Sequence, residues 1–282
     1  MKRKLGQGFE TVHLKSAQWE GDAILYPEGK KEQDFRRRMF PEEVFTAHHP
    51  AKANIFMVED IIKSVSDEGE TLLDPMGGTG TMIIAATMGR RVIIFDIEDV
   101  YHEIQVKAAE KMNVTDKVIC ILGNAEKVLP IPCNHVIFSP PYADIMKKSA
   151  SKTESGDWKG DITGDLYGAT TEEFGTYSRT KGNVGLLNKF MYSQVMERIY
   201  AKLYASVSPG GTVTSIVKDF IMGGQRVFIS EQVIRQGLRV GLEVDSWNKK
   251  WAGGSPFVKI RRAQGKITVD DEDIITFKRP MK

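Results

Sequence analysis

Short apolar runs and helical apolar spacing alternate along most of this chain of 282 residues. Apolar or alternating segments bounded by polar and turn-forming residues predict strands at residues 71–73, 92–95, 118–122, 135–138, 212–217, 243–251 and 274–277. Apolar positions at helical spacing predict helices at residues 50–65, 82–88, 100–112, 188–205 and 231–238. Strands separated by helices indicate an α/β protein with a doubly wound, mostly parallel sheet. Only a polar stretch separates the last two strands, so we expect them to pair antiparallel.

Three segments interrupt or precede this alternation. Residues 1–45 are polar and mixed, and their pattern assigns no regular element. We expect them to form an N-terminal extension to one domain at residues 46–282. Residues 143–187 are long, polar and glycine-rich, and residues 252–269 carry glycines, a proline and a basic cluster. Long loops in compact domains are usually functional or disordered. We therefore interpret 143–187 and 252–269 as candidate recognition insertions.

Composition and charge narrow the class of protein. Cys120 and Cys133 are too few for a disulfide framework, which predicts a reducing, cytoplasmic setting. No segment approaches the roughly 18 apolar residues of a membrane span, and no signal peptide is expected after the basic start. With five histidines and no spaced Cys/His/Asp cluster, no metal site is expected. The formal charge is only +2, so a nucleic-acid surface must come from local basic patches.

A glycine-rich turn, Asp74-Pro75-Met76-Gly77-Gly78-Thr79-Gly80-Thr81, joins a predicted strand to a predicted helix. Such turns lie at the ligand crevice of open α/β sheets, where glycine lets a ligand approach the backbone. A P-loop is excluded because no lysine follows Gly80, and a dinucleotide turn because Ile83 stands where a third glycine belongs. Asp96 ends the next strand, where a carboxylate can accept hydrogen bonds from a ribose diol. This acid suits S-adenosylmethionine or NAD alike, and an ordinary strand-to-helix turn is the structural alternative.

A second motif, Ser139-Pro140-Pro141-Tyr142, follows the predicted strand at residues 135–138. Its two prolines make a rigid ledge, and the ring of Tyr142 can stack on a planar base, a contact worth about 1–3 kcal/mol. The Ser139 hydroxyl and the Pro140 carbonyl can accept hydrogen bonds from an exocyclic amine and so concentrate its delocalised lone pair. A rigid turn with a core tyrosine is the alternative for this run alone. Because the glycine turn and Asp96 lie upstream, a purely structural turn is a weaker explanation of this run.

Taken together, the two motifs and Asp96 resemble the S-adenosylmethionine-dependent amino-methyltransferases of DNA, over about residues 45–280. The resemblance implies a Rossmann-like methyltransferase fold with a seven-stranded, mostly parallel sheet whose last strand is antiparallel. The resemblance also implies that residues 46–282 form the catalytic domain. It implies cofactor contacts from Phe45, His49, Lys52, Asp74, Pro75, Gly77, Gly78, Thr79, Gly80, Thr81, Asp96, Asn124 and Ala125. The catalytic residues that it implies are Ser139, Pro140, Pro141 and Tyr142. Asn124 departs from the family, in which aspartate is commoner at that place.

The chemistry implied by this resemblance is direct transfer from an activated sulfonium to an amine, which needs positioning and desolvation but no covalent enzyme intermediate. A target base in duplex DNA must be flipped out of the stack to reach the pocket. Pro132-Cys133 is similar to the nucleophile pair of carbon-5 cytosine methyltransferases. That nucleophile follows the strand, whereas Cys133 precedes it, so we expect a loop cysteine without a catalytic role.

Within the family, Ser-Pro-Pro-Tyr leans toward the N4 amine of cytosine, which we expect as the target in DNA. The N6 amine of adenine is the main alternative, and guanine in RNA a third, although no separate RNA-binding domain is recognised here. Residues 143–187 and 252–269 are expected to contact phosphates and base edges, with a disordered insertion as the alternative for the first. A nucleotide-binding regulator that transfers nothing is the hypothesis of a different class, and a small-molecule methyltransferase is another. The recognition sequence and the oligomeric state are not predicted.

Overall fold

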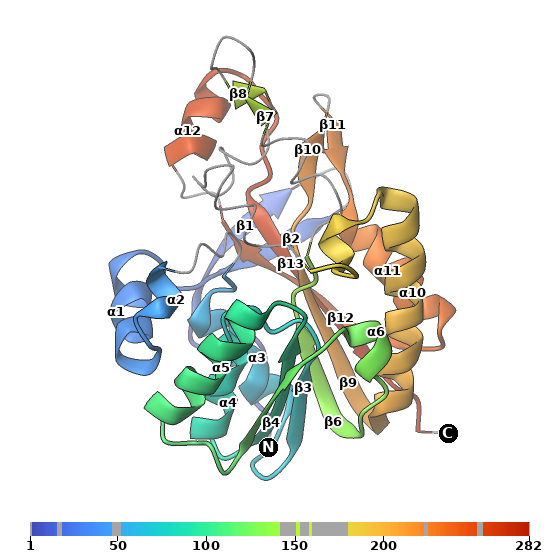
Figure 1. Cartoon of the computed structure of the whole chain (residues 1–282). Coiled ribbons are helices and arrows are strands. Elements are labelled where there is room, and N and C mark those ends of the chain that lie inside the picture. The colour runs from blue at the N-terminus through green and yellow to red at the C-terminus, as the bar shows by residue number, and fades with distance from the viewer. Residues whose placement is uncertain are drawn as a thin grey trace.

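The computed structural model describes residues 2–15, 19–46, 52–141, 151–152, 158–159, 180–222, 225–252 and 256–281 (Figure 1). Its strands are β1 (Glu10–Lys15), β2 (Glu20–Leu25), β3 (Thr71–Asp74), β4 (Arg91–Asp96), β5 (Val118–Leu122), β6 (Cys133–Phe138), β7 (Ser151–Lys152), β8 (Trp158–Lys159), β9 (Val207–Val217), β10 (Phe220–Met222), β11 (Gln225–Val227), β12 (Glu243–Trp251) and β13 (Asp271–Lys278). Its helices are α1 (Lys30–Met39), α2 (Glu43–Thr46), α3 (Ile55–Val65), η1 (Thr81–Ile83), α4 (Ile84–Thr87), α5 (Asp99–Lys111), α6 (Ala125–Val128), η2 (Val184–Leu186), α10 (Lys189–Ser206), α11 (Ile229–Arg239) and α12 (Pro256–Ala263).

Within the described residues, nine strands form one sheet in the order β1-β2-β12-β13-β9-β6-β3-β4-β5. The strands from β9 to β5 in this order pair in parallel, and β13 pairs antiparallel with both β9 and β12. The predicted α/β fold class is therefore confirmed, and so is the antiparallel pairing of the last two strands. The seven expected strands are those from β12 to β5, and β1 and β2 extend the sheet beyond them.

Side-chain alternation along the central strands produces two hydrophobic cores, one on each face of the sheet. Successive residues of a strand point to opposite faces, so Leu72 packs in one core and Leu73 in the other, and Ile137 and Phe138 divide in the same way. Figure 1 shows α3, α4 and α5 over one face and α6, α10 and α11 over the other. The central strands are thus buried on both sides, as is typical of a parallel sheet.

Two strands of the N-terminal segment belong to the same sheet. β1 and β2 form an antiparallel hairpin, and β2 continues the sheet by pairing in parallel with β12 at Ala23 and Ile24. The hairpin lacks a clear apolar pattern because β1 is exposed along much of its length. Strands at a sheet edge need little apolar patterning, so hydrophobic alternation is a weak signal for them.

Two predicted helices begin differently in the structure. Residues 52–54 are not helical, and α3 starts at Ile55 because the Asn54 carboxamide caps it, accepting from Phe56 N at 3.0 Å and Met57 N at 3.1 Å. The helix predicted over 82–88 starts one residue earlier, at Thr81, as the single 3₁₀ turn η1 and continues as the short α4. The left-handed backbone of Gly80, with a φ of 84°, precedes this tight start.

The order of the strands creates a crevice at the carboxyl ends of β3 and β6. The chain runs from β3 outward through β4 to β5 and then returns to place β6 on the other side of β3. Ligands of open α/β sheets bind at such a reversal of direction. Figure 1 shows β7, β8, α12 and the β10–β11 hairpin beyond this same end of the sheet. In the part of the chain that the structure describes, no helix is long and apolar enough to cross a membrane.

Candidate functional site

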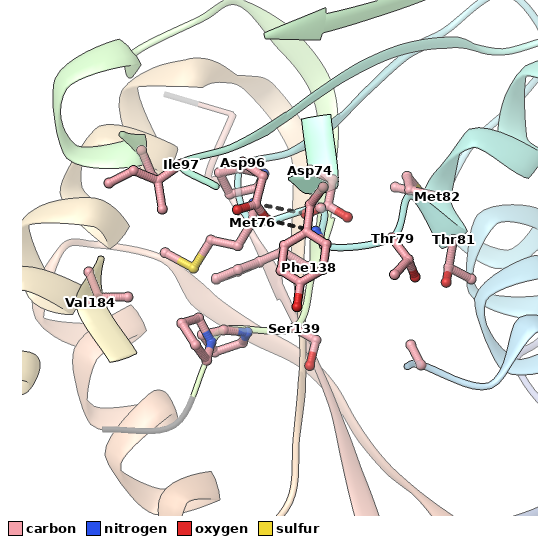
Figure 2. Close-up of a pocket in the computed structure, with 18 of the residues that line it drawn as sticks. Asp74, Met76, Thr79, Thr81, Met82, Asp96, Ile97, Phe138, Ser139 and Val184 are labelled. Carbon is pink, nitrogen blue, oxygen red and sulfur yellow. Dashed lines mark hydrogen bonds between the residues drawn. The ribbon is translucent and has the colours of Figure 1, made fainter. Parts of the chain in front are cut away.

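A pocket at the carboxyl ends of β3, β4 and β6 gathers most of the site residues that the sequence predicts (Figure 2). The predicted residues that line it are Lys52, Asp74, Pro75, Gly77, Gly78, Thr79, Thr81, Asp96, Asn124, Ala125, Ser139, Pro140 and Pro141. These residues come from five separate segments, which the sheet topology brings to one crevice. Figure 2 shows Thr79 and Thr81 to one side of Asp74, and Ile97 and Val184 to the other.

Four predicted residues are not among the pocket walls. Gly80 lies within the glycine turn without lining the cavity, where its φ of 84° shapes the backbone. Phe45 belongs to α2, but its side chain is outside the described part of the structure. His49 and Tyr142 both lie outside the described residues, as do most of residues 143–187 and the side chain of Trp158. Their predicted roles therefore rest on the sequence alone.

The glycine turn packs against the neighbouring strand so closely that one of its positions has no room for a side chain. A Cβ atom on Gly77 would lie 2.3 Å from Cγ1 and 2.5 Å from Cδ1 of Ile94, and 2.9 Å from Nε2 of Gln105. The Gly77 N–H donates to the carbonyl of Phe95 at 2.9 Å, which fixes the turn on β4. Gln105 also donates to the Gly78 carbonyl at 2.9 Å. The turn is therefore held from β4 and from α5.

Replacing Gly77 with alanine should destabilise the fold by about 1–3 kcal/mol, because the added methyl group overpacks the interior against Ile94. The change is measured as a lower midpoint of chemical unfolding. The matched comparison combines Gly77→Ala with Ile94→Val. The second change removes the Cδ1 atom of Ile94, so the two changes together should cost less stability than the sum of the two single variants. Another glycine such as Gly69 does not serve as a control, because its φ is 82°. Equal stability of Gly77→Ala and the unaltered protein would contradict this packing.

Asp96, at the end of β4, presents its carboxylate to the pocket. Its Oδ2 accepts from the Gly78 N–H at 2.8 Å and its Oδ1 from the Glu98 N–H at 3.0 Å. Each oxygen of a carboxylate has a second lone pair, so both can accept a further hydrogen bond from a ligand. Burial raises the pKa of Asp96 to about 6, against the stabilising effect of these backbone donors.

Asp74, at the end of β3, is a second buried carboxyl in the same pocket. It is 8% exposed, and its Oδ1 accepts from the Met76 N–H at 3.1 Å. Burial raises the pKa of Asp74 to about 7, and the neighbouring charge of Asp96 acts in the same direction. Lys52 lies in the pocket too, and burial, followed by the charge of Arg36, lowers its pKa to about 8. The pocket thus offers hydrogen-bond acceptors and a cation around an apolar interior.

The Ser139-Pro140-Pro141 ledge leaves a strand end that is firmly packed. Phe138 is buried and makes an edge-to-face contact with Tyr200, with ring centroids 5.9 Å apart. Tyr200 is itself fixed by a hydrogen bond of 2.7 Å between its hydroxyl and Ser215 Oγ. Pro140 is buried, whereas Ser139 is partly exposed and lines the cavity. The backbone that carries Ser139 is therefore held by the core beneath it.

Sequence reasoning missed one wall of the pocket, formed by Gly182, Asn183 and Val184 at the end of the 143–187 insertion. Glu98, only 3% exposed, holds this wall: it accepts from Asn183 Nδ2 at 2.7 Å and from Thr180 Oγ1 at 2.8 Å. Asn124 Nδ2 also donates to the Gly182 carbonyl at 3.0 Å. No local motif marks these residues, because a long-range contact from Glu98 defines their place.

Cys133 differs from its prediction as a loop cysteine. It is the first residue of β6, is 5% exposed and packs in the core on the α10 side of the sheet. Burial raises the pKa of its thiol to about 12, so the thiolate that a nucleophile needs is not formed near neutral pH. Among the described residues, no group of three His, Cys, Asp or Glu side chains is arranged to hold a metal ion.

Part of the chain is similar in sequence to known proteins. Residues 3–107 match the family model of the DNA methylases of the N6 and N4 type. A stretch of 75 residues is 36% identical to the type II methyltransferase M2.DpnII of Streptococcus pneumoniae, covering 26% of this chain and 28% of that enzyme. Within residues 3–107 the chain is thus similar to the DNA methylases. Its DNA-methylase match includes the glycine turn and Asp96 and begins in the N-terminal segment, whereas the Ser139 ledge lies beyond it.

Solved structures agree on the fold over most of the chain. TrmN from Thermus thermophilus superposes with a TM-score of 0.53 and 11% identity, covering 83% of this chain and 52% of that one. The [4+2]-cyclase SpnF superposes with a TM-score of 0.51 and 14% identity, covering 82% and 83% of the two chains. At such low identity the likeness shows a Rossmann-like fold alone, and it carries no information on substrate.

Proposed function

We propose that this protein is a DNA methyltransferase that transfers a methyl group from S-adenosylmethionine to the exocyclic N4 amine of cytosine. The observation that carries the proposal is that Asp96 and the Ser139-Pro140 ledge line one continuous pocket at the carboxyl end of the sheet. A cofactor site and an amine-binding site must share a cavity if a methyl group is to pass between them. The match of residues 3–107 to the DNA methylases supports methylation of DNA, of either the N6 or the N4 type.

The residues present fit S-adenosylmethionine in polarity and in placement. The free lone pairs of Asp96 suit the two hydroxyls of a ribose, and the apolar side chains of Ile97 and Val184 suit the faces of an adenine. Asp74 suits the ammonium group and Lys52 the carboxylate of the amino-acid part. Phe45 and His49 are proposed to help enclose that part. Bound S-adenosylmethionine supplies an electrophilic methyl group on its sulfonium.

The chain's own contribution to transfer is to hold and activate the amine. Ser139 Oγ and the Pro140 carbonyl are proposed to accept its two N–H bonds, which localises the nitrogen lone pair toward the methyl group. Pro140 and Pro141 restrict the backbone, so that these acceptors are in place before the base arrives. Tyr142 is proposed to stack on the base. Neither a covalent intermediate nor Cys133 takes part.

The DNA is proposed to approach the end of the sheet where the pocket opens. Figure 1 places α12 and the β7–β8 and β10–β11 pairs at this end. α12 carries Lys259 and Arg262, which are exposed and suited to phosphate contacts. Residues 143–187 and 252–269 are therefore proposed as target-recognition segments, with the flipped base entering beneath them.

Nucleoside mass spectrometry of DNA and RNA from cells that express the protein tests the proposal. We expect N4-methylcytosine in DNA, and none in cells that express Ser139→Ala. N6-methyladenine in its place would redirect the activity to the alternative target, and methylguanine confined to RNA would assign an RNA substrate. Unmodified nucleic acid, together with tight binding of S-adenosylhomocysteine to the purified protein, would support the nucleotide-binding regulator.

Cofactor affinity should fall as the pH is lowered from 7.5 to 5. A ribose diol donates best to an ionised carboxylate, and the pKa values of Asp96 and Asp74 are raised to about 6 and about 7, so both are largely protonated at pH 5. With about a tenth of Asp96 ionised there, the dissociation constant of S-adenosylhomocysteine should rise at least about tenfold, as measured by calorimetry. Asp96→Asn should reduce this dependence to the part that Asp74 contributes. A constant affinity across this range would contradict the proposed ionisation.

A further inference from the structure

One arginine of the N-terminal segment is buried beside the pocket. Arg36 of α1 is 4% exposed, whereas its neighbours Arg37 and Arg38 are exposed. A buried guanidinium requires partners for its donors, because an unpaired buried charge is strongly unfavourable. Its partners therefore show what it does.

The guanidinium of Arg36 joins two walls of the pocket. Its Nη1 donates to Thr81 Oγ1 at 3.2 Å, and its Nη2 donates to the carbonyl of Ala53. Thr81 belongs to the glycine turn and its helix, and Ala53 to the segment that precedes α3, and both residues line the cavity. One side chain from residues 30–39 thus fixes the distance between two segments that are far apart in sequence.

A carboxylate holds the guanidinium in this place. Glu32 Oε1 accepts from Arg36 Nε at 3.2 Å and Nη2 at 3.0 Å, and it also accepts from the Ile55 N–H at 3.1 Å. Glu32 Oε2 accepts from Asn54 Nδ2 at 3.2 Å, and Asn54 caps α3. Buried ion pairs contribute little net stability compared with apolar packing. The role of this network is therefore better explained by the way it positions the pocket wall than by a gain in net stability.

The hydrogen bond from Arg36 also determines what Thr81 can offer. An arginine is only a donor, so Thr81 Oγ1 is the acceptor of this bond, and its own hydroxyl proton is left to be donated elsewhere. The charge of Arg36 is also close enough to Lys52 to contribute to lowering the Lys52 pKa. The end of the pocket near Lys52 and Thr81 is therefore rich in donors and positive charge.

We propose that Arg36 is a positioning residue of the cofactor site, which orients the Thr81 hydroxyl as a donor toward an acceptor group of the ligand. The inference rests on the proposed function and assigns a role in it to the N-terminal segment. Arg36 acts through Thr81 and Ala53, without contact to the reacting atoms.

Calorimetry with S-adenosylhomocysteine and the full chain tests this role. Arg36→Gln should weaken binding about tenfold, the scale of one hydrogen bond to a charged group. Arg36→Lys should restore part of the loss, and Arg38→Gln, the same change on the exposed side of α1, should leave the affinity unchanged. In methyl transfer, Arg36→Gln should raise the KM for S-adenosylmethionine and leave kcat within about twofold.

A double-mutant cycle separates positioning from general destabilisation. If Arg36 acts through the Thr81 hydroxyl, then Arg36→Gln combined with Thr81→Val should bind no more weakly than the weaker single variant. Additive losses, or an affinity of Arg36→Gln within twofold of the unaltered protein, would overturn the inference. Should Arg36→Gln fail to fold, Thr81→Val and Thr81→Ser decide it, since only serine keeps the hydroxyl and should retain binding. No binding by the unaltered protein would instead refute the proposed function.

Discussion

Replacing Asp96 with alanine is expected to weaken the binding of S-adenosylhomocysteine about a hundredfold. The carboxylate is the group proposed to accept both ribose hydroxyls, and each hydrogen bond to a charged acceptor is worth roughly an order of magnitude in affinity. The same change also leaves the Gly78 and Glu98 N–H groups without their acceptor, which loosens the glycine turn. Titration calorimetry at pH 7.5 measures the effect.

Asp99→Ala provides the matched control for this variant. Asp99 carries the same charge three residues along the chain, but it is exposed at the start of α5 and does not line the pocket. Its replacement should leave the affinity unaltered. If Asp96→Ala binds as tightly as Asp99→Ala, Asp96 is not a ligand of the ribose and the site must be assigned again.

The second large effect is expected at Ser139, where a substitution should lower the rate of methyl transfer and leave cofactor binding nearly unchanged. Ser139→Ala should lower the rate of methyl transfer about 10²–10³-fold, the range seen when one preorganised hydrogen-bond partner of a transition state is removed. Cofactor affinity should stay within about twofold, because Ser139 is proposed to contact the base. The rate is measured as transfer of labelled methyl groups to DNA under single-turnover conditions.

Ser208→Ala is the control for Ser139. Ser208 is an exposed serine of β9 whose hydroxyl donates to the Cys133 carbonyl at 3.1 Å, at the opposite end of the sheet from the pocket. It should retain full activity. Full activity of Ser139→Ala would show that the ledge does not activate the amine, and loss of cofactor binding in Ser139→Ala would place Ser139 on the wrong side of the cavity.

The parts of the fold that the sequence predicts are those determined by local patterns. Buried parallel strands appear in the sequence as apolar runs. The glycine turn is recognisable because its backbone requires glycine: Gly77 has no space for a side chain, and Gly80 has a positive φ. Asp96 follows from its place at a strand end. The alternation of elements then brings these residues to one crevice, because parallel strands end on the same edge of the sheet.

The parts that were missed depend on contacts between distant residues. The wall at Gly182–Val184 is held by Glu98, and the wall at Ala53 by Arg36, across separations that no local spacing reveals. The edge hairpin of β1 and β2 lacks apolar alternation, so its addition to the sheet was equally hidden. The apolar run that marks β6 begins only after Asn134, so the pattern predicts a loop at Cys133, although the strand starts there.

The place of β13 in the sheet has a consequence for how the chain folds during synthesis. β13 lies between β9 and β12, and β12 in turn carries β2, so the N-terminal hairpin reaches its place only through strands at the end of the chain. This half of the sheet must therefore wait until residue 278 has emerged from the ribosome. Until then one edge of β9 lacks its partner, a state that favours slow folding and association with other chains.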